Sequence, residues 1–229
     1  MPRGRAPGYD TQREQILARA AELFARQGYS GTSMNQVAAA CGVSKASLYH
    51  YVHDKYRLLV EIAEGHVDRL RALVADEAAP KTDETQQRPP EARLRELIVR
   101  FMGAYADAQA QHRVLTEDVK FLEPDDRRRI LDGERAVVDA FARAIAAARP
   151  DLGAARLEKP LTMLLFGMMN WMFTWLRPEG PLSHAQLTPV VADLFFGGLV
   201  AVQAPAPAPP AAPGRSRTRT SRAAARVAA

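Results

Sequence analysis

Apolar residues recur at helical spacing along most of this chain, and no segment alternates apolar and polar residues as a half-buried strand would. The first helical segment carries Ile16 and Phe24 on one apolar stripe and ends at Gly28. Thr11 and Glu14 have the spacing of a capping box, which predicts that this helix begins at Thr11. The same pattern predicts further helices near residues 33–40, 44–51, 54–74, 91–110, 113–122, 125–148, 155–176 and 184–202. The predicted fold class is therefore all-α.

The charged residues give the chain basic ends and an acidic middle. Residues 1–60 hold eight Lys and Arg against four Asp and Glu, and residues 61–203 hold eighteen against twenty-two. Residues 204–229 hold five arginines and no acid. Basic ends are typical of proteins that bind a polyanion such as nucleic acid, although arginines can also serve only to keep a surface soluble.

Cysteine content and hydropathy predict a reduced, soluble, cytoplasmic protein. Cys41 is the single cysteine, which excludes a fold held by intramolecular disulfides. The first residues lack the apolar run of a signal peptide. The longest nearly apolar stretch, Leu161–Leu176, has 16 residues and contains Asn170. A membrane span needs about 20 residues, so we expect a buried helix and no membrane contact.

Two of the predicted helices, 33–40 and 44–51, are short and are joined by a turn at Gly42, which is typical of a helix-turn-helix. The amino end of the second helix is the part that reaches into the major groove of DNA. There, Lys45 can donate to guanine, Ser47 can pair with either kind of base edge, and Ala46 is small enough to touch a thymine methyl. The surrounding residues with donors suited to phosphate are Thr32, Ser33, Tyr49, His50, Tyr51 and Lys55. We therefore predict double-stranded DNA as a partner.

Several short motifs have fixed spacings within residues 11–60. They are Gly28-Tyr29, Thr32-Ser33-Met34, Val37-Ala38, Gly42-Val43-Ser44, Leu48-Tyr49-His50-Tyr51 and Lys55. On these motifs the segment resembles the amino-terminal domain of TetR/AcrR-family transcriptional regulators. The resemblance implies an all-helical homodimer with an amino-terminal DNA-binding domain and a larger carboxy-terminal ligand domain. It departs at Val52, where many members have an aromatic residue, which should change packing and not the DNA role.

The resemblance also implies roles for single residues. Asn35, Lys45, Ala46 and Ser47 stand where the family reads bases. Thr32, Ser33, Tyr49, Tyr51 and Lys55 stand where it grips phosphates. We predict a basic arm at 1–9, a helix-turn-helix domain at 10–55, a ligand-binding and dimerisation domain at 56–203, and a disordered Ala/Pro/Arg tail at 204–229.

The carboxy-terminal half carries a second resemblance. Residues 166–175, Pro178-Glu179-Gly180-Pro181-Leu182 and residues 193–199 are similar to a branch of the family that responds to acyl-CoA thioesters and controls fatty-acid, phenylacetate or sterol catabolism. This resemblance implies a small-molecule effector of the acyl-CoA class. We expect its acyl part among Leu115, Phe121, Met163, Phe166 and Met169. The last two helices usually form the dimer contact in the family. We therefore expect the dimer interface to contain Trp171, Trp175, Leu194 and Phe195.

Other conspicuous residues have simpler interpretations. Cys41 is predicted to be a buried thiol and not a redox sensor, because there is no second cysteine. His112 stands near Glu117 and Asp118, but no metal-ligand spacing recurs, so we predict a pocket rim or surface position and no metal. The run 125–129 is interpreted as a solvated helix start, with CoA phosphates as the alternative partner of its arginines. No catalytic set is recognisable, so we predict neither an enzyme nor a cofactor.

These observations leave three hypotheses. The leading one is a repressor that a ligand releases from a near-palindromic operator. The second is a sequence-independent, DNA-compacting architectural protein, suggested by the basic tail. The third is an enzyme or lipid carrier with a vestigial DNA domain. Graded affinity for all DNA would support the second, and turnover of a bound thioester would support the third.

Overall fold

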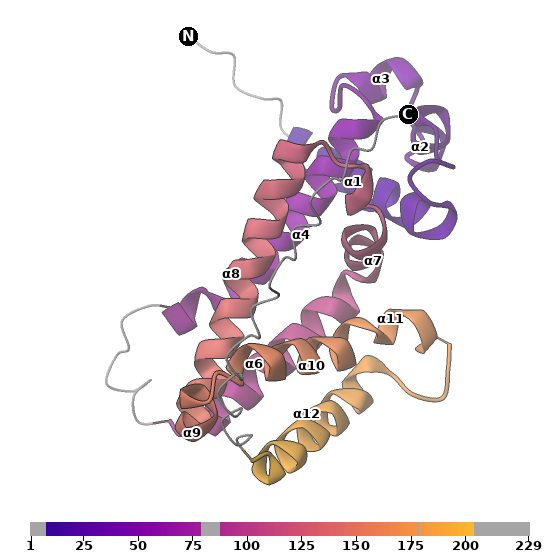
Figure 1. The fold of residues 1–229 in the computed structure, drawn as a ribbon. Helices are drawn as coiled ribbons and strands as arrows, with labels where there is room; N and C mark the ends of the chain where they lie inside the picture. Colours follow the sequence, from indigo (N-terminus) through magenta and orange to yellow (C-terminus); the bar gives the residue numbers. More distant parts are fainter. Residues whose placement is uncertain (1–7, 79–87, 178, 204–229) are drawn as a thin grey trace, which may run out of the picture.

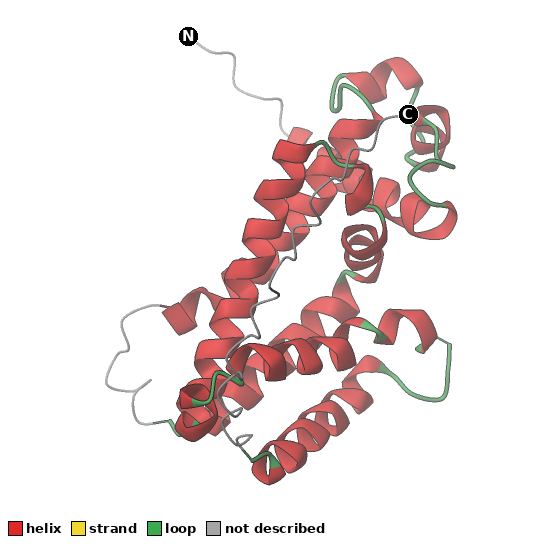
Figure 2. Cartoon of the chain, in the orientation of Figure 1, coloured by secondary structure: helices red, strands yellow, loops and turns green. Residues whose placement is uncertain are grey.

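The structure, a computed structural model, describes residues 8–78, 88–177 and 179–203. The described residues form helices and loops and contain no strand, which confirms the all-α prediction (Figure 2). The helices are α1 (Tyr9–Gln27), α2 (Met34–Ala40), α3 (Lys45–Tyr49), α4 (Lys55–Ala78), α6 (Pro90–Asp107), α7 (Gln109–Glu117), the 3-10 helix η1 (Val119–Phe121), α8 (Pro124–Ala148), α9 (Pro150–Ala154), α10 (Glu158–Asn170), α11 (Met172–Trp175) and α12 (His184–Ala201). The predicted arm and tail lie outside the described residues, except for Gly8 and Tyr9.

The long helices α4 and α8 pack side by side and connect the two ends of the molecule (Figure 1). Helices α1, α2 and α3 lie at one end, and α6, α10 and α12 lie at the other. Helices α6 and α10 pack on α8, and α12 packs on α6. A shift of α4 against α8 would therefore move the first three helices relative to the rest.

Two clusters of buried apolar side chains share helix α4. The N-terminal cluster joins α1, α2 and α3 to the first half of α4, and it also takes in Val114 and Leu115 of α7 and Ile130 of α8. The C-terminal cluster begins on α4 at Leu70 and Val74 and continues through α6 and α8 to α12. The predicted boundary between residues 55 and 56 thus falls at the start of a helix that contributes to both clusters.

Two predicted helix boundaries are wrong. Helix α1 begins at Tyr9, after Gly8 with its positive φ of 89°, so Thr11 lies inside the helix and does not cap it. The Tyr9 ring stacks on Tyr51 with centroids 4.9 Å apart, and this tertiary contact favours the earlier start. The predicted helix 155–176 is in fact α10 and α11, which are separated at Trp171.

Helix α12 is the one described helix that is long and apolar enough to cross a membrane by length and composition. Part of its apolar surface is buried within the molecule, where Val191, Phe195 and Leu199 belong to the C-terminal cluster beside α6. The remainder, including Leu194 and Val200, is exposed.

Candidate DNA-binding surface and ligand cavity

Local capping and one glycine turn build the helix-turn-helix. Ser33 caps α2, because its Oγ accepts from the backbone N–H of Gln36 while the Gln36 side chain accepts from the Ser33 N–H. Gly42 turns the chain with a φ of 66°, a value that favours glycine. Ser44 caps α3 by accepting from the Ser47 N–H at 3.0 Å. The buried Leu48 then fixes α3 against the N-terminal cluster.

The side chains predicted to read bases lie on the outer surface of this unit. Lys45 and Ala46 are exposed at the amino end of α3, and Ser47 is half-buried beside them. Asn35 is exposed near the start of α2. The amino end of α3 is therefore available to a groove, and the base-reading roles of these four residues remain a prediction.

The residues predicted to grip phosphate fall into two groups. Ser33 and Tyr49 are exposed, and Tyr51 is half-buried under Tyr9, so these side chains remain near the outer surface. Thr32 is only 2% exposed. Its hydroxyl donates to the Gly28 carbonyl at 2.9 Å and accepts from Gln27 at 3.1 Å. The phosphate role predicted for the Thr32 side chain is therefore wrong, because its hydroxyl is already paired inside the fold.

Lys55 also has an internal role that the sequence did not indicate. Its Nζ donates to the carbonyls of Tyr29 and Thr32 at 3.0 and 2.9 Å, and it lies 4.4 Å from the Tyr29 ring centroid. An ammonium group has three donors, so at most one is left for a phosphate. Lys55 therefore ties the start of α4 to the loop between α1 and α2.

A cavity of about 210 Å³ lies where α4, α6, α7, α8 and α10 meet. Leu115, Met163 and Phe166, three of the predicted ligand contacts, line it. The other lining residues are Val67, Leu70, Tyr105, His112, Thr116, Glu134, Val137, Val138 and Asn170. This cavity is mostly apolar, with a few polar side chains, as small-molecule sites usually are.

The other two predicted ligand contacts lie elsewhere. Met169 is buried in the C-terminal cluster but is not part of the cavity wall. Phe121 lies on η1 and is 40% exposed, with its ring centroid 5.3 Å from that of Tyr29. The Phe121 prediction is corrected, because η1 packs toward the DNA-binding end of the molecule. Glu134 and Asn170 were not predicted to line the cavity, although a lone Asn in an apolar run is a usable signal for such a position.

Burial disfavours the charged forms of the titratable groups near this cavity. It lowers the pKa of His112 to about 4, and burial together with the His112 ring lowers the pKa of His66 to about 3. Burial also raises the pKa of the Glu134 carboxyl and of the Tyr105 hydroxyl. In the described part of the chain, no group of three or more His, Cys, Asp or Glu side chains is placed to hold a metal ion.

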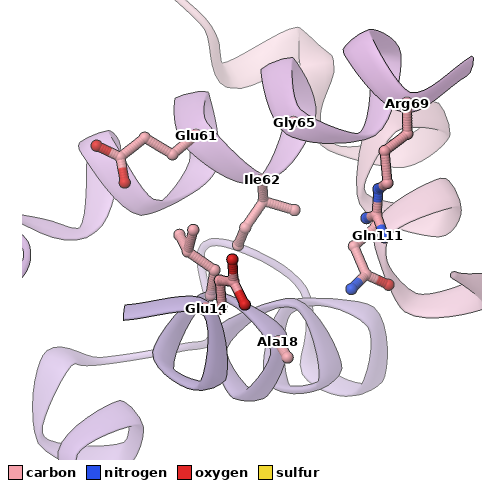
Figure 3. A pocket seen from close by; sticks show the side chains of 8 residues that line it. Glu14, Ala18, Glu61, Ile62, Gly65, Arg69 and Gln111 are labelled. Atoms are coloured by element: carbon pink, nitrogen blue, oxygen red, sulfur yellow. The ribbon is translucent and has the colours of Figure 1, made fainter. Parts of the chain in front are cut away.

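A second hollow, of about 520 Å³, lies between α1, α4 and α7 (Figure 3). Glu61 and Ile62 on α4 face Glu14 and Ala18 on α1, and Gln111 lies near Arg69 at the other end. Glu61 pairs with Arg13 at 2.7 Å, which ties α1 to α4 across this hollow. The smaller cavity fits an apolar ligand better, because more of its wall is apolar side chain.

Two arginines of the segment 125–129 are paired within the protein. Arg128 pairs with Asp125, and Arg129 pairs with Asp126 at 2.6 Å and with Glu64 of α4 at 2.7 Å. Asp126 also accepts a hydrogen bond of 2.5 Å from Tyr56 of α4. These contacts support the interpretation of this run as a helix start, and they fasten α8 to α4.

An apolar surface extends over α10, α11 and α12. Trp171 is 64% exposed, and Leu164, Trp175 and Leu194 are also largely exposed. Exposed apolar surface of this kind is typical of a protein–protein interface. Phe195 is only 6% exposed and belongs to the C-terminal cluster, so its predicted interface role is corrected. Helical spacing alone did not tell which face of α12 turns inward.

The chain matches two family models. Residues 16–62 match the model described as bacterial regulatory proteins, tetR family, and residues 87–199 match the tetracyclin repressor-like C-terminal domain. The chain is 26% identical over 197 residues to the HTH-type transcriptional activator FasR of Mycolicibacterium smegmatis, which covers 86% of this chain and 87% of that protein.

Two solved structures extend the likeness to the whole fold. A TetR-family transcriptional regulator from Bordetella parapertussis is 32% identical with a TM-score of 0.72, covering 83% of this chain and 97% of that one. AibR, in complex with isovaleryl coenzyme A and operator DNA, is 25% identical with a TM-score of 0.67, covering 81% and 98%. With a helix-turn-helix at one end and a ligand-sized cavity beside α4, the chain belongs to the TetR family of transcriptional regulators.

Proposed function

We propose that this regulator acts as a homodimeric repressor in the cytoplasm, and that an acyl-CoA thioester releases it from a near-palindromic operator. The observation that carries the proposal is the position of the 210 Å³ cavity. Val67 and Leu70 of α4 form part of its wall, and the start of α4 is tied to the helix-turn-helix by Lys55. A ligand that occupies this cavity therefore touches the helix that positions α3.

The ligand acts by favouring one arrangement of α4 and α8. It can shift the equilibrium only by its difference in affinity for the two arrangements. In a dimer, a small rotation of α4 changes the spacing of the two α3 helices, and both must fit half-sites about one helical turn apart. The likeness to AibR supports an acyl-CoA as the effector class.

The dimer contact is assigned to the exposed apolar surface of α10, α11 and α12. Trp171, Trp175 and Leu194 lie on it. Two copies of this surface would form a self-complementary interface of the kind that a two-fold dimer needs. The base-reading role goes to Asn35, Lys45, Ala46 and Ser47, and the phosphate role to Ser33, Tyr49 and Tyr51.

The DNA-compacting alternative is not favoured. The relatives found are transcriptional regulators that align with most of the chain, and the cavity has no use in a protein that only coats DNA. The two functions differ in the ratio of operator affinity to random-DNA affinity, which is large for a repressor and near one for a compacting protein.

The test is a titration of operator binding with effector. An operator is first selected from random duplexes, and binding is measured by fluorescence anisotropy with isovaleryl-CoA, palmitoyl-CoA, coenzyme A and isovalerate. At least one thioester should lower operator affinity about tenfold or more, while coenzyme A and the free acid should have little effect. Val138→Trp should fill the cavity and abolish the response while operator binding persists. Val99→Trp, at an exposed position on α6, is the matched control. No response to any thioester would contradict the effector proposal.

A further inference from the structure

A pair of buried histidines connects α4 to the wall of the cavity. His66 of α4 and His112 of α7 are 1% and 4% exposed, and His66 Nε2 lies 3.3 Å from His112 Nδ1. The His112 ring stacks on Tyr105 with centroids 4.1 Å apart and meets the Phe173 ring edge-on. These contacts hold the imidazole of His112 in one orientation, with one nitrogen used by His66.

Three polar side-chain atoms of this region have no hydrogen-bond partner. His112 Nε2, His66 Nδ1 and Asn170 Oδ1 are buried and lack a hydrogen bond in the described structure. His112 and Asn170 both belong to the cavity wall. A buried polar atom without a partner costs about 1–3 kcal/mol, and native proteins tolerate few of them. An unpartnered ring nitrogen of the buried His112 at the wall of a cavity indicates that a polar group of a ligand completes the site, whereas Asn170 Oδ1 is an acceptor that only a ligand donor could satisfy.

The histidine pair determines what kind of polar group fits best. One hydrogen joins the two rings, so only two neutral arrangements are possible. If His66 donates, His112 Nε2 carries a hydrogen that needs an acceptor, and His66 Nδ1 is left as a bare acceptor. If His112 donates, a ligand donor would satisfy His112 Nε2, but His66 would keep a buried N–H without a partner. Buried N–H groups without a partner are rarer in proteins than buried acceptors without one. A ligand that accepts from His112 Nε2 leaves only the His66 Nδ1 acceptor unpaired, which is the less costly of the two arrangements.

We propose that the cavity binds an uncharged carbonyl group, whose oxygen accepts a hydrogen bond from His112 Nε2, and that it rejects the corresponding carboxylate. This inference rests on the proposed function and defines its ligand more closely. Most of the remaining wall is apolar, and the cavity volume of 210 Å³ corresponds to roughly seven water molecules at about 30 Å³ each. A short acyl chain fills such a space, with the thioester carbonyl at its polar side.

A carboxylate is rejected because other oxygen atoms face it from the cavity wall. Asn170 Oδ1 is an acceptor, and Glu134 adds a carboxyl to the same wall. Burial keeps both histidines neutral, so a carboxylate would enter without a positive partner. His66 acts here as a positioning residue, because it fixes the hydrogen of His112 and carries the contact onto α4.

The experiment compares two CoA compounds that differ only in the carbonyl group next to sulfur. Isovaleryl-CoA has the thioester carbonyl, and S-(3-methylbutyl)-CoA has a methylene in its place. Direct binding to the full chain is measured by calorimetry. The thioester should bind about tenfold or more tightly than the thioether, and His112→Phe should remove that difference. His184→Phe, a histidine outside the cavity wall, should preserve it.

A second measurement covers the case in which a variant misfolds or neither CoA compound binds. The nitrogen resonances of ¹⁵N-histidine-labelled wild-type protein report which ring nitrogen carries hydrogen. 4-Methylpentan-2-one should bind and hold His112 in the form protonated at Nε2, whereas isovalerate, which has a carboxylate oxygen in place of the ketone methyl, should leave the spectrum unchanged. If the ketone acts but neither CoA compound binds, the carbonyl site stands and the acyl-CoA proposal fails. The inference would be overturned if thioester and thioether bind equally well, or if ketone and carboxylate have equal effects on the spectrum. It would also be overturned if the ring resonances of His112 do not respond to the ketone.

Discussion

Gly133 of α8 lies directly against Val67 of α4, so that a Cβ atom added at Gly133 would come within 2.4 Å of Val67 Cγ1. The two helices approach this closely because position 133 has no side chain. We expect Gly133→Ala to lower the free energy of unfolding by about 1–3 kcal/mol, because the added methyl forces α4 and α8 apart. Urea denaturation of the purified protein measures this change.

Two further variants separate this clash from a general effect of replacing glycine. Val67→Ala removes the opposing methyl groups and should recover part of the loss in the double variant. Gly103→Ala adds a methyl inside α6 with no atom within 4 Å, and should raise stability by about 0.5–1 kcal/mol. Equal losses for the two glycine variants would contradict the close contact.

The His66–His112 pair should make stability depend on pH. The pKa values of about 3 and about 4 lie below the ordinary value of 6.5, so the unfolded chain binds more protons than the folded one below pH 6.5. The free energy of unfolding should therefore fall as the pH drops from 6.5 toward 4, by up to about 1.4 kcal/mol per pH unit for each histidine. Urea titrations at pH 7.5, 6.5 and 5.5 measure the slope.

The other groups around the pair do not remove this dependence. Arg69 on α4 adds to the lowering at His66, and Glu134 on α8 has a raised pKa, which acts with the opposite sign. The comparison of wild type with His66→Phe/His112→Phe isolates the histidines. A slope that is the same in both proteins would show that these imidazoles do not titrate on unfolding.

Lys55→Met should act on stability and leave the salt dependence of DNA binding unchanged. The variant keeps the aliphatic stem but loses the bonds to the carbonyls of Tyr29 and Thr32, at a cost of about 1–3 kcal/mol. A phosphate contact would instead reduce the slope of log affinity against log salt by about one per half-site. A reduced slope with unchanged stability would restore Lys55 to the phosphate contacts.

Lys45→Ala, in contrast to Lys55→Met, should weaken operator binding and leave stability nearly unchanged. Lys45 is exposed at the amino end of α3, so its removal should change stability by less than about 0.5 kcal/mol. If it pairs with guanine, it should cost about 1–3 kcal/mol of operator binding, concentrated at one base position per half-site. Binding to a panel of single-base operator variants measures this, and an equal loss on every variant would assign Lys45 to phosphate.

Trp171→Asp should dissociate the dimer, because it places a charge in the exposed apolar surface of α10, α11 and α12. Burial of an unpaired charge costs several kcal/mol, so sedimentation should detect monomers and operator binding should be lost. Val99→Asp changes an exposed apolar residue on α6 and should leave the dimer intact. A dimeric Trp171→Asp protein would place the subunit contact elsewhere.

The sequence predicted well the features that depend on neighbouring residues. The cap at Ser44 and the turn at Gly42 are local, and the structure has both. The cap at Thr11 was wrong because the stacking of Tyr9 on Tyr51 joins residues far apart in the sequence. Thr32 was misassigned for a similar reason, since a hydroxyl that pairs within a loop looks the same in sequence as one that faces solvent.

The site in the second half was predicted only in part. Leu115, Met163 and Phe166 line the cavity, and their contact with a ligand stays a prediction, whereas Phe121 and Phe195 do not have their predicted roles. Apolar periodicity identifies a buried stripe without telling whether it packs inside the subunit, against a ligand or against a second subunit. His66 was missed because its importance comes from a contact with α7, 46 residues away.

The N-terminal cluster does not end where the helix-turn-helix ends. It includes Val114 and Leu115 of α7, Leu122 after η1 and Ile130 of α8. A fragment that stops within α4 would leave the partners of these residues exposed to water. Exchange of operator specificity with another member, by recombination or by protein engineering, would therefore have to transfer residues near 110–130 together with the first 67, and a simple cut between the two functions would yield an insoluble chimera.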